Sequence, residues 1–192
     1  MKRIALFLAG VLAFAGLATS CHPTLSIAKL GNPDSALVGT WVNDSTINEN
    51  SSTGRAYDSY TFNADGTFSQ KGYMKMEIKD TSYISIIDIS FSGAGTYGVA
   101  DGKINFKFKA SEAEAVLNDF DVRLLGESAD PKAASITKTI VNLIMVRPMM
   151  KAMKTSMKKD QVYILNSLSS DTLRMTNSTA KDPKTDTFIK AE

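Results

Sequence analysis

The feature that most constrains the fold is an alternation of apolar and polar residues in short consecutive segments. Residues 103–109 show it best, because Ile104, Phe106 and Phe108 alternate with lysine and asparagine. Successive side chains of a strand point to opposite faces, so this pattern predicts a strand with one apolar face. Similar segments, separated by turns that contain Asp, cover residues 57–62, 67–78 and 83–91. Their succession predicts an antiparallel meander.

Further strands are expected on both sides of this meander. Residues 43–55 lie between the expected strand at residues 37–42 and the one at residues 57–62. They are polar and predict a loop long enough to cover the mouth of a barrel. Gly93, Gly95 and Gly98 favour a sharply bent strand, as the corner of a barrel requires. The additional strands are expected at residues 37–42, 161–166, 172–176 and 187–190. Together the segments predict a mainly β fold, an antiparallel β-barrel.

The pattern becomes helical between residues 111 and 159, which we expect to form an insert before the last hairpin. A capping-box pattern at its start predicts a short helix over residues 112–120. Asp130 followed by Pro131 predicts a second helix that runs to about Arg147. The predicted fold is therefore a barrel domain at residues 37–192 with an α-helical insert.

The second half of the insert is rich in methionine and in basic residues. Residues 140–146 are apolar almost all round, which predicts burial on more than one side, and Pro148 is expected to break or kink the helix. Residues 131–159 carry seven basic residues and no acid. Three interpretations remain open: a lid over the barrel, a helix on an anionic membrane surface, or a helix packed on the barrel with a solvated basic face. The lid candidates are Met149, Met150, Met153 and Met157.

Four short motifs resemble those of lipocalin-like lipoproteins of the Bacteroidetes type. Residues 37–41 resemble the G-x-W opening of lipocalins. Residues 61–68, 95–97 and 168–173 resemble further signatures in the same order. The resemblance covers roughly residues 37–109 and 161–190 and implies a barrel that holds a small ligand. In lipocalins the tryptophan closes the barrel base beneath a basic residue, so the resemblance assigns Trp41 the first role and makes Arg174 the candidate for the second.

The inward-facing apolar residues are the candidates for a cavity lining. In a barrel wide enough to hold one small molecule they contact the ligand, and in a filled barrel they form a packed core. The alternation alone does not separate these two interpretations. The candidate lining residues are Phe68, Met74, Met76, Ile89, Phe91, Ile104, Phe106, Phe108 and Met175, and Ile78, Ile87 and Leu173 share their orientation.

The first residues predict export and lipid anchoring. Lys2 and Arg3 precede an uncharged apolar run that is too short to span a bilayer comfortably, so residues 1–20 are interpreted as a signal peptide. Small residues before Cys21 resemble a lipobox, which implies a lipid on this cysteine and a membrane as partner. Cys21 is the only cysteine, so the chain forms no internal disulfide. Residues 21–36 are expected to be a tether, and the expected location is the outer membrane, facing the periplasm.

Several kinds of chemistry are missing from the sequence. His22 is the only histidine, so no Ser-His-Asp or Cys-His site and no histidine-based zinc site forms in the domain. No phosphate-binding or dinucleotide-binding glycine motif is present, and we expect neither a metal nor a cofactor. Lys2 and Arg3 account for the net charge of +2, so the mature part is neutral and no nucleic acid is expected. A catalytic pair among the strand and turn aspartates is the one enzymatic alternative.

The sequence therefore favours a lipid-anchored envelope protein that binds a small apolar or amphipathic molecule without catalysis. The alternative is a protein-interaction or scaffold module of the cell envelope with a filled barrel core. An accessible apolar cavity would favour binding, whereas a dry core with an exposed apolar patch would favour the scaffold.

Overall fold

The computed structural model describes residues 30–49, 51–125, 130–180 and 183–192, and the statements below refer to these residues. The predicted signal peptide, Cys21 and the first part of the predicted tether lie outside these residues. In chain order the elements are β1 (Gly39–Glu49), β2 (Ser52–Phe62), β3 (Thr67–Lys79), β4 (Tyr83–Ala100), β5 (Lys103–Phe108), β6 (Glu114–Leu124), α2 (Pro131–Val141), η1 (Asn142–Val146), α3 (Arg147–Ser156), β7 (Gln161–Leu168), β8 (Thr172–Asn177) and β9 (Thr185–Lys190).

The strands form a closed antiparallel barrel. Neighbouring strands pair in the order β3-β2-β1-β9-β8-β7-β5-β4, and a further pairing between β3 and β4 closes this ring of eight. β6 pairs with β4 outside the ring. The helical arm, defined here as α2, η1 and α3, lies between β6 and β7. The predicted barrel with a helical insert before the last hairpin is confirmed.

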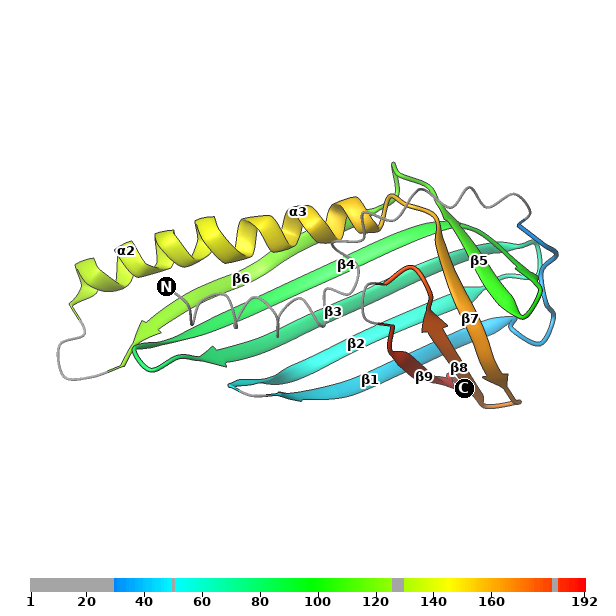
Figure 1. Cartoon of the computed structure of the whole chain (residues 1–192), viewed down its shortest axis with the longest axis horizontal. Coiled ribbons are helices and arrows are strands. Elements are labelled where there is room, and N and C mark those ends of the chain that lie inside the picture. Colours follow the sequence, from blue (N-terminus) through cyan, green and yellow to red (C-terminus); the bar gives the residue numbers. More distant parts are fainter. Residues whose placement is uncertain (1–29, 50, 126–129, 181–182) are drawn as a thin grey trace.

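The long strand β4 divides the molecule into two ends. Its first residues, 83–92, pair with β6, whereas residues 95–100 pair with β5 and so complete the barrel. Beyond this closed end, β1, β2, β3, β4 and β6 continue as one curved sheet (Figure 1). Gly95 lies where β4 meets β5, and a Cβ there would come within 2.1 Å of the Lys107 carbonyl oxygen. The glycine expected to bend the strand therefore allows the backbones of β4 and β5 to come closer together than any other residue would permit.

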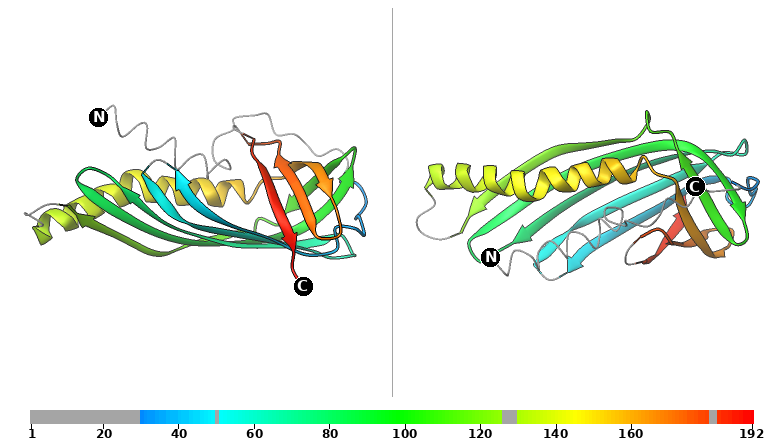
Figure 2. Two further views of the ribbon diagram at one scale, coloured as in Figure 1. Left: turned by 90° about the horizontal axis from the view of Figure 1, so that it is seen from below. Right: turned by 45° about the horizontal axis from the view of Figure 1, so that its top comes forward.

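Two apolar cores follow from this division. The closed-end core is mostly aromatic and includes Trp41, Tyr60 and Phe106. The extended-end core lies between the concave face of the curved sheet and the helical arm, and it includes Met76, Ile89 and Met153. The arm's main strand contacts are with β6, so it covers that side of the sheet (Figure 2).

The expected loop at residues 43–55 is wrong. β1 continues to Glu49 and β2 begins at Ser52, and the two strands pair along their whole length. The segment has a polar composition because its outward side chains are polar and two of its inward residues, Ser45 and Gly54, are small. Strand pairing satisfies the backbone on both sides of β2, so the weak apolar pattern does not prevent a strand.

The expected helix at residues 112–120 is also wrong, because this segment is the strand β6. Its pairing with β4 shifts register between Asp88 and Ile89, which leaves Asn118 as the extra residue of a β-bulge. The bulge changes the spacing of inward side chains to a helix-like one, and a capping-box pattern at the start strengthened the wrong interpretation. The residues that face the extended-end core are Ala115, Leu117, Phe120 and Val122.

The second predicted helix is confirmed at its start. The Asp130 carboxylate accepts a hydrogen bond of 2.9 Å from the Lys132 amide, and Pro131 occupies the first turn. Pro148 does not end the helix. A π-helical turn precedes it, in which the Arg147 amide bonds to the Asn142 carbonyl, and this wider turn accommodates the missing proline N–H.

The expected burial of residues 140–146 on more than one side is wrong. Val141 and Val146 are buried, whereas Ile140, Leu143 and Ile144 are exposed. The arm therefore has one face on the sheet, although its sequence is apolar around most of its circumference. No described helix is long and apolar enough to cross a membrane.

Candidate functional site

A cluster of polar side chains lies inside the barrel, between the two apolar cores. The Gln70 side-chain amide donates to both Asp58 carboxylate oxygens, at 3.0 and 3.1 Å, and to the Tyr60 hydroxyl at 2.8 Å. Across the barrel, the Tyr163 hydroxyl donates to Gln161 Oε1 at 3.2 Å. This polar cluster consists of Asp58, Tyr60, Gln70, Gln161, Tyr163 and Asn177, from β2, β3, β7 and β8.

Strand alternation explains why these polar groups face inward. Tyr60 and Phe62 are buried on β2, so Asp58 two residues earlier shares their face. Asn177 donates to the Tyr163 hydroxyl at 3.2 Å, and its own oxygen accepts from the Thr179 amide at 2.9 Å. Most of the buried polar atoms are therefore satisfied within the protein.

Asp58 is the chemically unusual member of the polar cluster. Burial raises its pKa to about 7, because the hydrogen bonds from Gln70 offset only part of the cost of removing a carboxylate from water. The nearby charge of Asp186 on β9 acts in the same direction. Burial also raises the pKa of Asp186 itself. Two carboxyl groups with raised pKa values therefore influence each other in this region, and Gln70 is the side chain that donates to Asp58.

Asp58 also marks the start of an accessible strip on the inner surface. Ser45 on β1 and Gly54, Ala56 and Asp58 on β2 are inward-facing positions that remain half-buried. We call these four residues the inner strip. Opposite them on β3, Met74, Met76 and Ile78 are buried. The side chains of Ser45 and Ala56 are small, and methionines, which repack easily, lie beside them on β3. At Gly54 a Cβ would come within 2.2 Å of the Lys75 carbonyl oxygen, so the two backbones are in close contact there.

The inner surface is long and has a second polar position at its far end. From Gly72, which pairs with Asp58, to Ile78 the strand β3 advances six residues, or ~20 Å at ~3.3 Å per residue. Ser85 on β4 pairs with Ile78 and is buried. Its hydroxyl is the one buried side-chain polar atom without a hydrogen-bond partner among the described residues.

The predicted cavity-lining residues fall into two separate sets. Five lie in the closed-end core, where ring centroids of Phe68 are 4.9 Å from those of Phe106 and Phe108. Contacts this short mean that the closed end is packed with side chains. Phe91 packs against the extended-end core. The closed-end residues are Phe68, Ile104, Phe106, Phe108 and Met175, and the extended-end core contains Met74, Met76 and Ile89.

The four lid candidates lie between the arm and the sheet. Met149 and Met153 belong to the extended-end core, and Met150 packs against it. Met157 is buried near Gly93 of β4. The end of α3 is joined to the polar cluster, because Gln161 Nε2 donates to the Ser156 carbonyl at 3.5 Å. The arm therefore covers the extended-end core from the β4 and β6 side, while the inner strip lies on β1 and β2.

Trp41 lies in the closed-end core, and the basic residue that contacts it differs from the expected one. The Lys190 ammonium lies 5.2 Å from the Trp41 ring centroid. Arg174 is exposed on the outer face, because Leu173 and Met175 on either side of it point inward. Trp41 is fully buried, and its indole N–H donates to the Leu37 carbonyl at 2.7 Å. The alternation of β8 already excluded Arg174 from this role.

Comparison with known protein families and with curated proteins gives no match. Among the described residues, no group of three or more histidine, cysteine, aspartate or glutamate side chains is placed to hold a metal ion. The structure thus defines a class by its fold alone, a closed eight-stranded antiparallel barrel with a helical insert. The polar cluster was not predicted from the sequence, although strand alternation places Asp58 on the same inward face of β2 as Tyr60.

Proposed function

We propose that this chain is a lipid-anchored envelope protein that binds a small amphipathic molecule without catalysis. The observation that carries the proposal is the half-buried Asp58, whose carboxyl lies at the junction of a polar cluster and an apolar inner surface. Ligand sites are mostly apolar with a few convergent polar groups, which is the composition found here. The polar end of the ligand binds at Asp58, and its apolar end lies along the inner strip.

The polar cluster favours a ligand head that donates hydrogen bonds. Asp58 has two acceptor oxygens, and the Gln70 side-chain amide donates to both of them. Asp186 adds a second carboxyl group to the same region. A protonated amine, or a hydroxyl group, would supply the missing donors, and hydrogen bonds to a charged group are about twice as strong as neutral ones.

The inner strip favours an unbranched apolar tail. Gly54 and Ala56 are the smallest inward residues of β2. Their paired neighbours on β3 are methionines, which have flexible side chains. An inner surface ~20 Å long accommodates an extended alkyl chain. In this arrangement the helical arm closes the site from the β6 side, which is the lid function inferred for its methionines.

The scaffold alternative keeps two supporting observations. At the closed end the aromatic side chains fill the barrel, and on the helical arm large apolar side chains are exposed. The two proposals therefore differ in whether the extended end accepts a ligand.

The first test is native mass spectrometry on a chain that begins at His22, purified without detergent. We expect a co-purified amphipathic molecule. Isothermal titration with dodecylamine and dodecanoate then probes the head, and we expect the amine to bind more tightly. Asp58→Asn should weaken amine binding about tenfold to a hundredfold, as expected for losing one hydrogen bond to a charged group. The matched control, Asp65→Asn, alters a carboxylate in the β2–β3 turn and should bind like the parent.

A second pair of variants probes the tail. Ala56→Phe fills the inner strip and should abolish binding of dodecylamine, whereas Ser59→Phe places the same ring on the outer face and should leave it intact. A bare mass together with no uptake of either amphiphile by folded protein would refute the binding proposal and favour the scaffold.

A further inference from the structure

The exposed face of the helical arm has an apolar first half. Ile136, Ile140, Leu143 and Ile144 are 54%, 51%, 59% and 45% exposed, respectively. Their spacing of three to four residues places them in one row along α2 and η1. Single exposed apolar residues are common, but four large ones in a row on one helix face mark an interaction surface. We call this row the apolar stripe.

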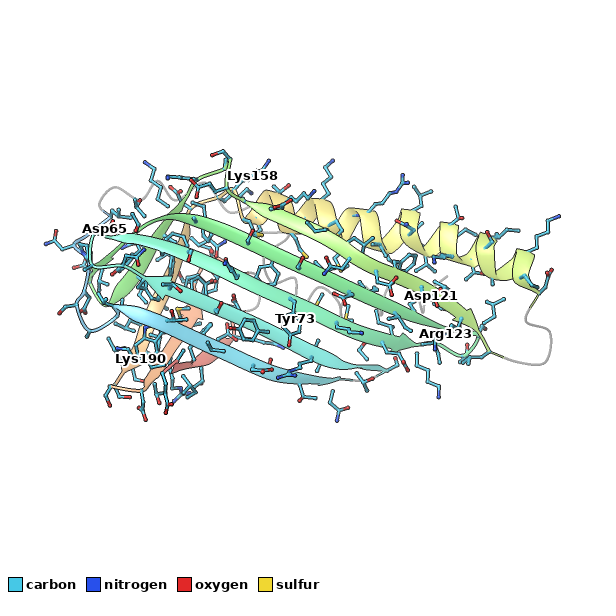
Figure 3. The ribbon with its side chains drawn as sticks, turned by 180° about the vertical axis from the view of Figure 1, so that it is seen from behind. Asp65, Tyr73, Asp121, Arg123, Lys158 and Lys190 are labelled. Carbon is cyan, nitrogen blue, oxygen red and sulfur yellow. The ribbon has the colours of Figure 1, made fainter. Side chains whose placement is uncertain are left out.

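The second half of the same arm is basic. A groove of about 460 Å³ lies between the arm and β6, with Leu117, Val146 and Met150 on its apolar part. Four cationic side chains also line it, namely Arg147, Lys151, Lys154 and Lys158. Figure 3 shows Lys158 at the end of α3, with Asp121 and Arg123 on β6 nearer the α2 end. We call this feature the basic groove.

The cations of the basic groove form no ion pair with any residue that the structure describes. In the described part of the chain, the ion pair of the arm is that of Lys138 with Asp121 at 3.4 Å, and it lies outside the groove. Within residues 131–159 there is no acidic residue at all. Four cations beside one apolar groove create a local positive potential that attracts an anionic partner.

We propose that the exposed face of the helical arm docks on an anionic phospholipid surface. The basic groove binds phosphate headgroups, and the apolar stripe enters the boundary between headgroups and acyl chains. The exposed side of the arm thus offers both apolar side chains and cations, and apolar burial together with attraction to anionic lipid is what binds a peripheral helix to a membrane interface. The inner strip is on a different part of the molecule, so this proposal does not depend on the ligand-binding proposal.

This arrangement also assigns a role to the exposed isoleucines. The buried face of the arm is already complete, because Val141, Val146, Met149 and Met153 contact the sheet. The apolar stripe adds nothing to that packing and costs solubility in water. Insertion of these side chains into lipid removes their surface from water, and the adjacent cations add attraction that salt weakens.

The test uses the full chain reconstituted in vesicles and a tryptophan placed on the stripe. Trp41 is the only native tryptophan and is fully buried, so it gives a constant background. We expect Ile140→Trp to shift its emission to the blue and to be quenched by brominated acyl chains in vesicles of phosphatidylglycerol and phosphatidylcholine. In pure phosphatidylcholine the shift and the quenching should be lost. The matched control is Ile189→Trp, at an isoleucine that is 54% exposed on β9.

Charge variants made in the Ile140→Trp background decide whether the basic groove drives docking. Lys151→Gln with Lys154→Gln should weaken docking about thirtyfold, since each basic residue near an anionic surface contributes roughly a fivefold increase in binding. Lys71→Gln with Lys75→Gln removes the same charge from the outer face of β3 and should have no effect. The proposal is overturned if position 140 stays in water on anionic vesicles, if position 189 is quenched equally, or if both charge pairs act alike.

Discussion

The raised pKa of Asp58 predicts an unusual dependence of stability on pH. A carboxyl group with a folded pKa of about 7 and an ordinary value near 3.8 binds more protons in the folded state than in the unfolded state between these two pH values. Its contribution is therefore most favourable at acidic pH and is lost as pH rises toward 7. A pKa difference of three units changes the free energy of unfolding by about 4 kcal/mol. Partial solvent access of the side chain reduces this change to roughly 2–4 kcal/mol.

The variant that tests this prediction is Asp58→Asn. Its side-chain oxygen still accepts a hydrogen bond from Gln70, but the side chain carries no charge. We expect the variant to be more stable than the parent at pH 8 by roughly 2–4 kcal/mol. At ~2–4 °C per kcal/mol for a chain of this size, its Tm should rise by about 5–15 °C. The difference should shrink as the pH falls through 4 and approach zero below about pH 3, where the parent carboxyl is largely protonated in both states. Thermal unfolding followed by circular dichroism at several pH values measures this difference.

Asp65→Asn is the control variant, and its effect on stability at neutral pH is expected to have the opposite sign. Hydrogen bonds from the Thr67 hydroxyl and amide lower the pKa of Asp65, so this carboxylate stabilises the fold at neutral pH and loses that effect in acid. Its asparagine variant should be less stable at pH 8 and equal to the parent at low pH. If Asp58→Asn destabilised the protein at pH 8, or changed stability equally at pH 4 and 8, the buried-carboxylate argument would be wrong.

The other predictions concern packing and the barrel base. Phe106→Ala should cost about 3–5 kcal/mol in urea unfolding, because the ring packs among other aromatic rings of the closed end; a cost below 1 kcal/mol would contradict a packed core. Gly95→Ala should reduce the folded yield sharply, since a methyl group there meets the β5 backbone, and a normal circular dichroism spectrum and Tm would refute this. Lys190→Ala should change Trp41 fluorescence and cost about 0.5–1 kcal/mol, whereas an equal effect of Arg174→Ala would contradict the observed contact.

The sequence predicted the barrel because most of its strands alternate without interruption. β5 presents an apolar side chain at every second residue, as does the second half of β3, and the boundaries of both strands fall within one residue of those expected. β6 was missed because the bulge at Asn118 shifts the alternation by one residue in mid-strand. A bulge depends on pairing with β4, so the local sequence of β6 does not reveal it.

The candidate site was harder to predict for a different reason. The candidate cavity-lining residues were chosen because they are apolar. That criterion leaves out Asp58 and Gln70, although both occupy inward positions in the alternation of their strands. The apolar rows of β3 and β5 read alike, yet Phe106 belongs to the packed closed end and Met76 to the extended end. This difference arises because β4 exchanges one neighbour for another along its length, which is a property of strand pairing rather than of composition.

Departures from the simplest pattern occur at the positions where we propose that this barrel binds a ligand and a membrane. An inward aspartate raises the energy of the folded state above pH 4, and an outward row of isoleucine and leucine exposes apolar surface to water. Neither feature helps the chain to fold, and local choices that oppose the fold are expected at functional positions. Asp58 faces the inner strip, whereas the apolar stripe faces away from the sheet. A ligand inside and a membrane outside would each offset one of these costs, so the two proposals explain separate residues and can fail independently.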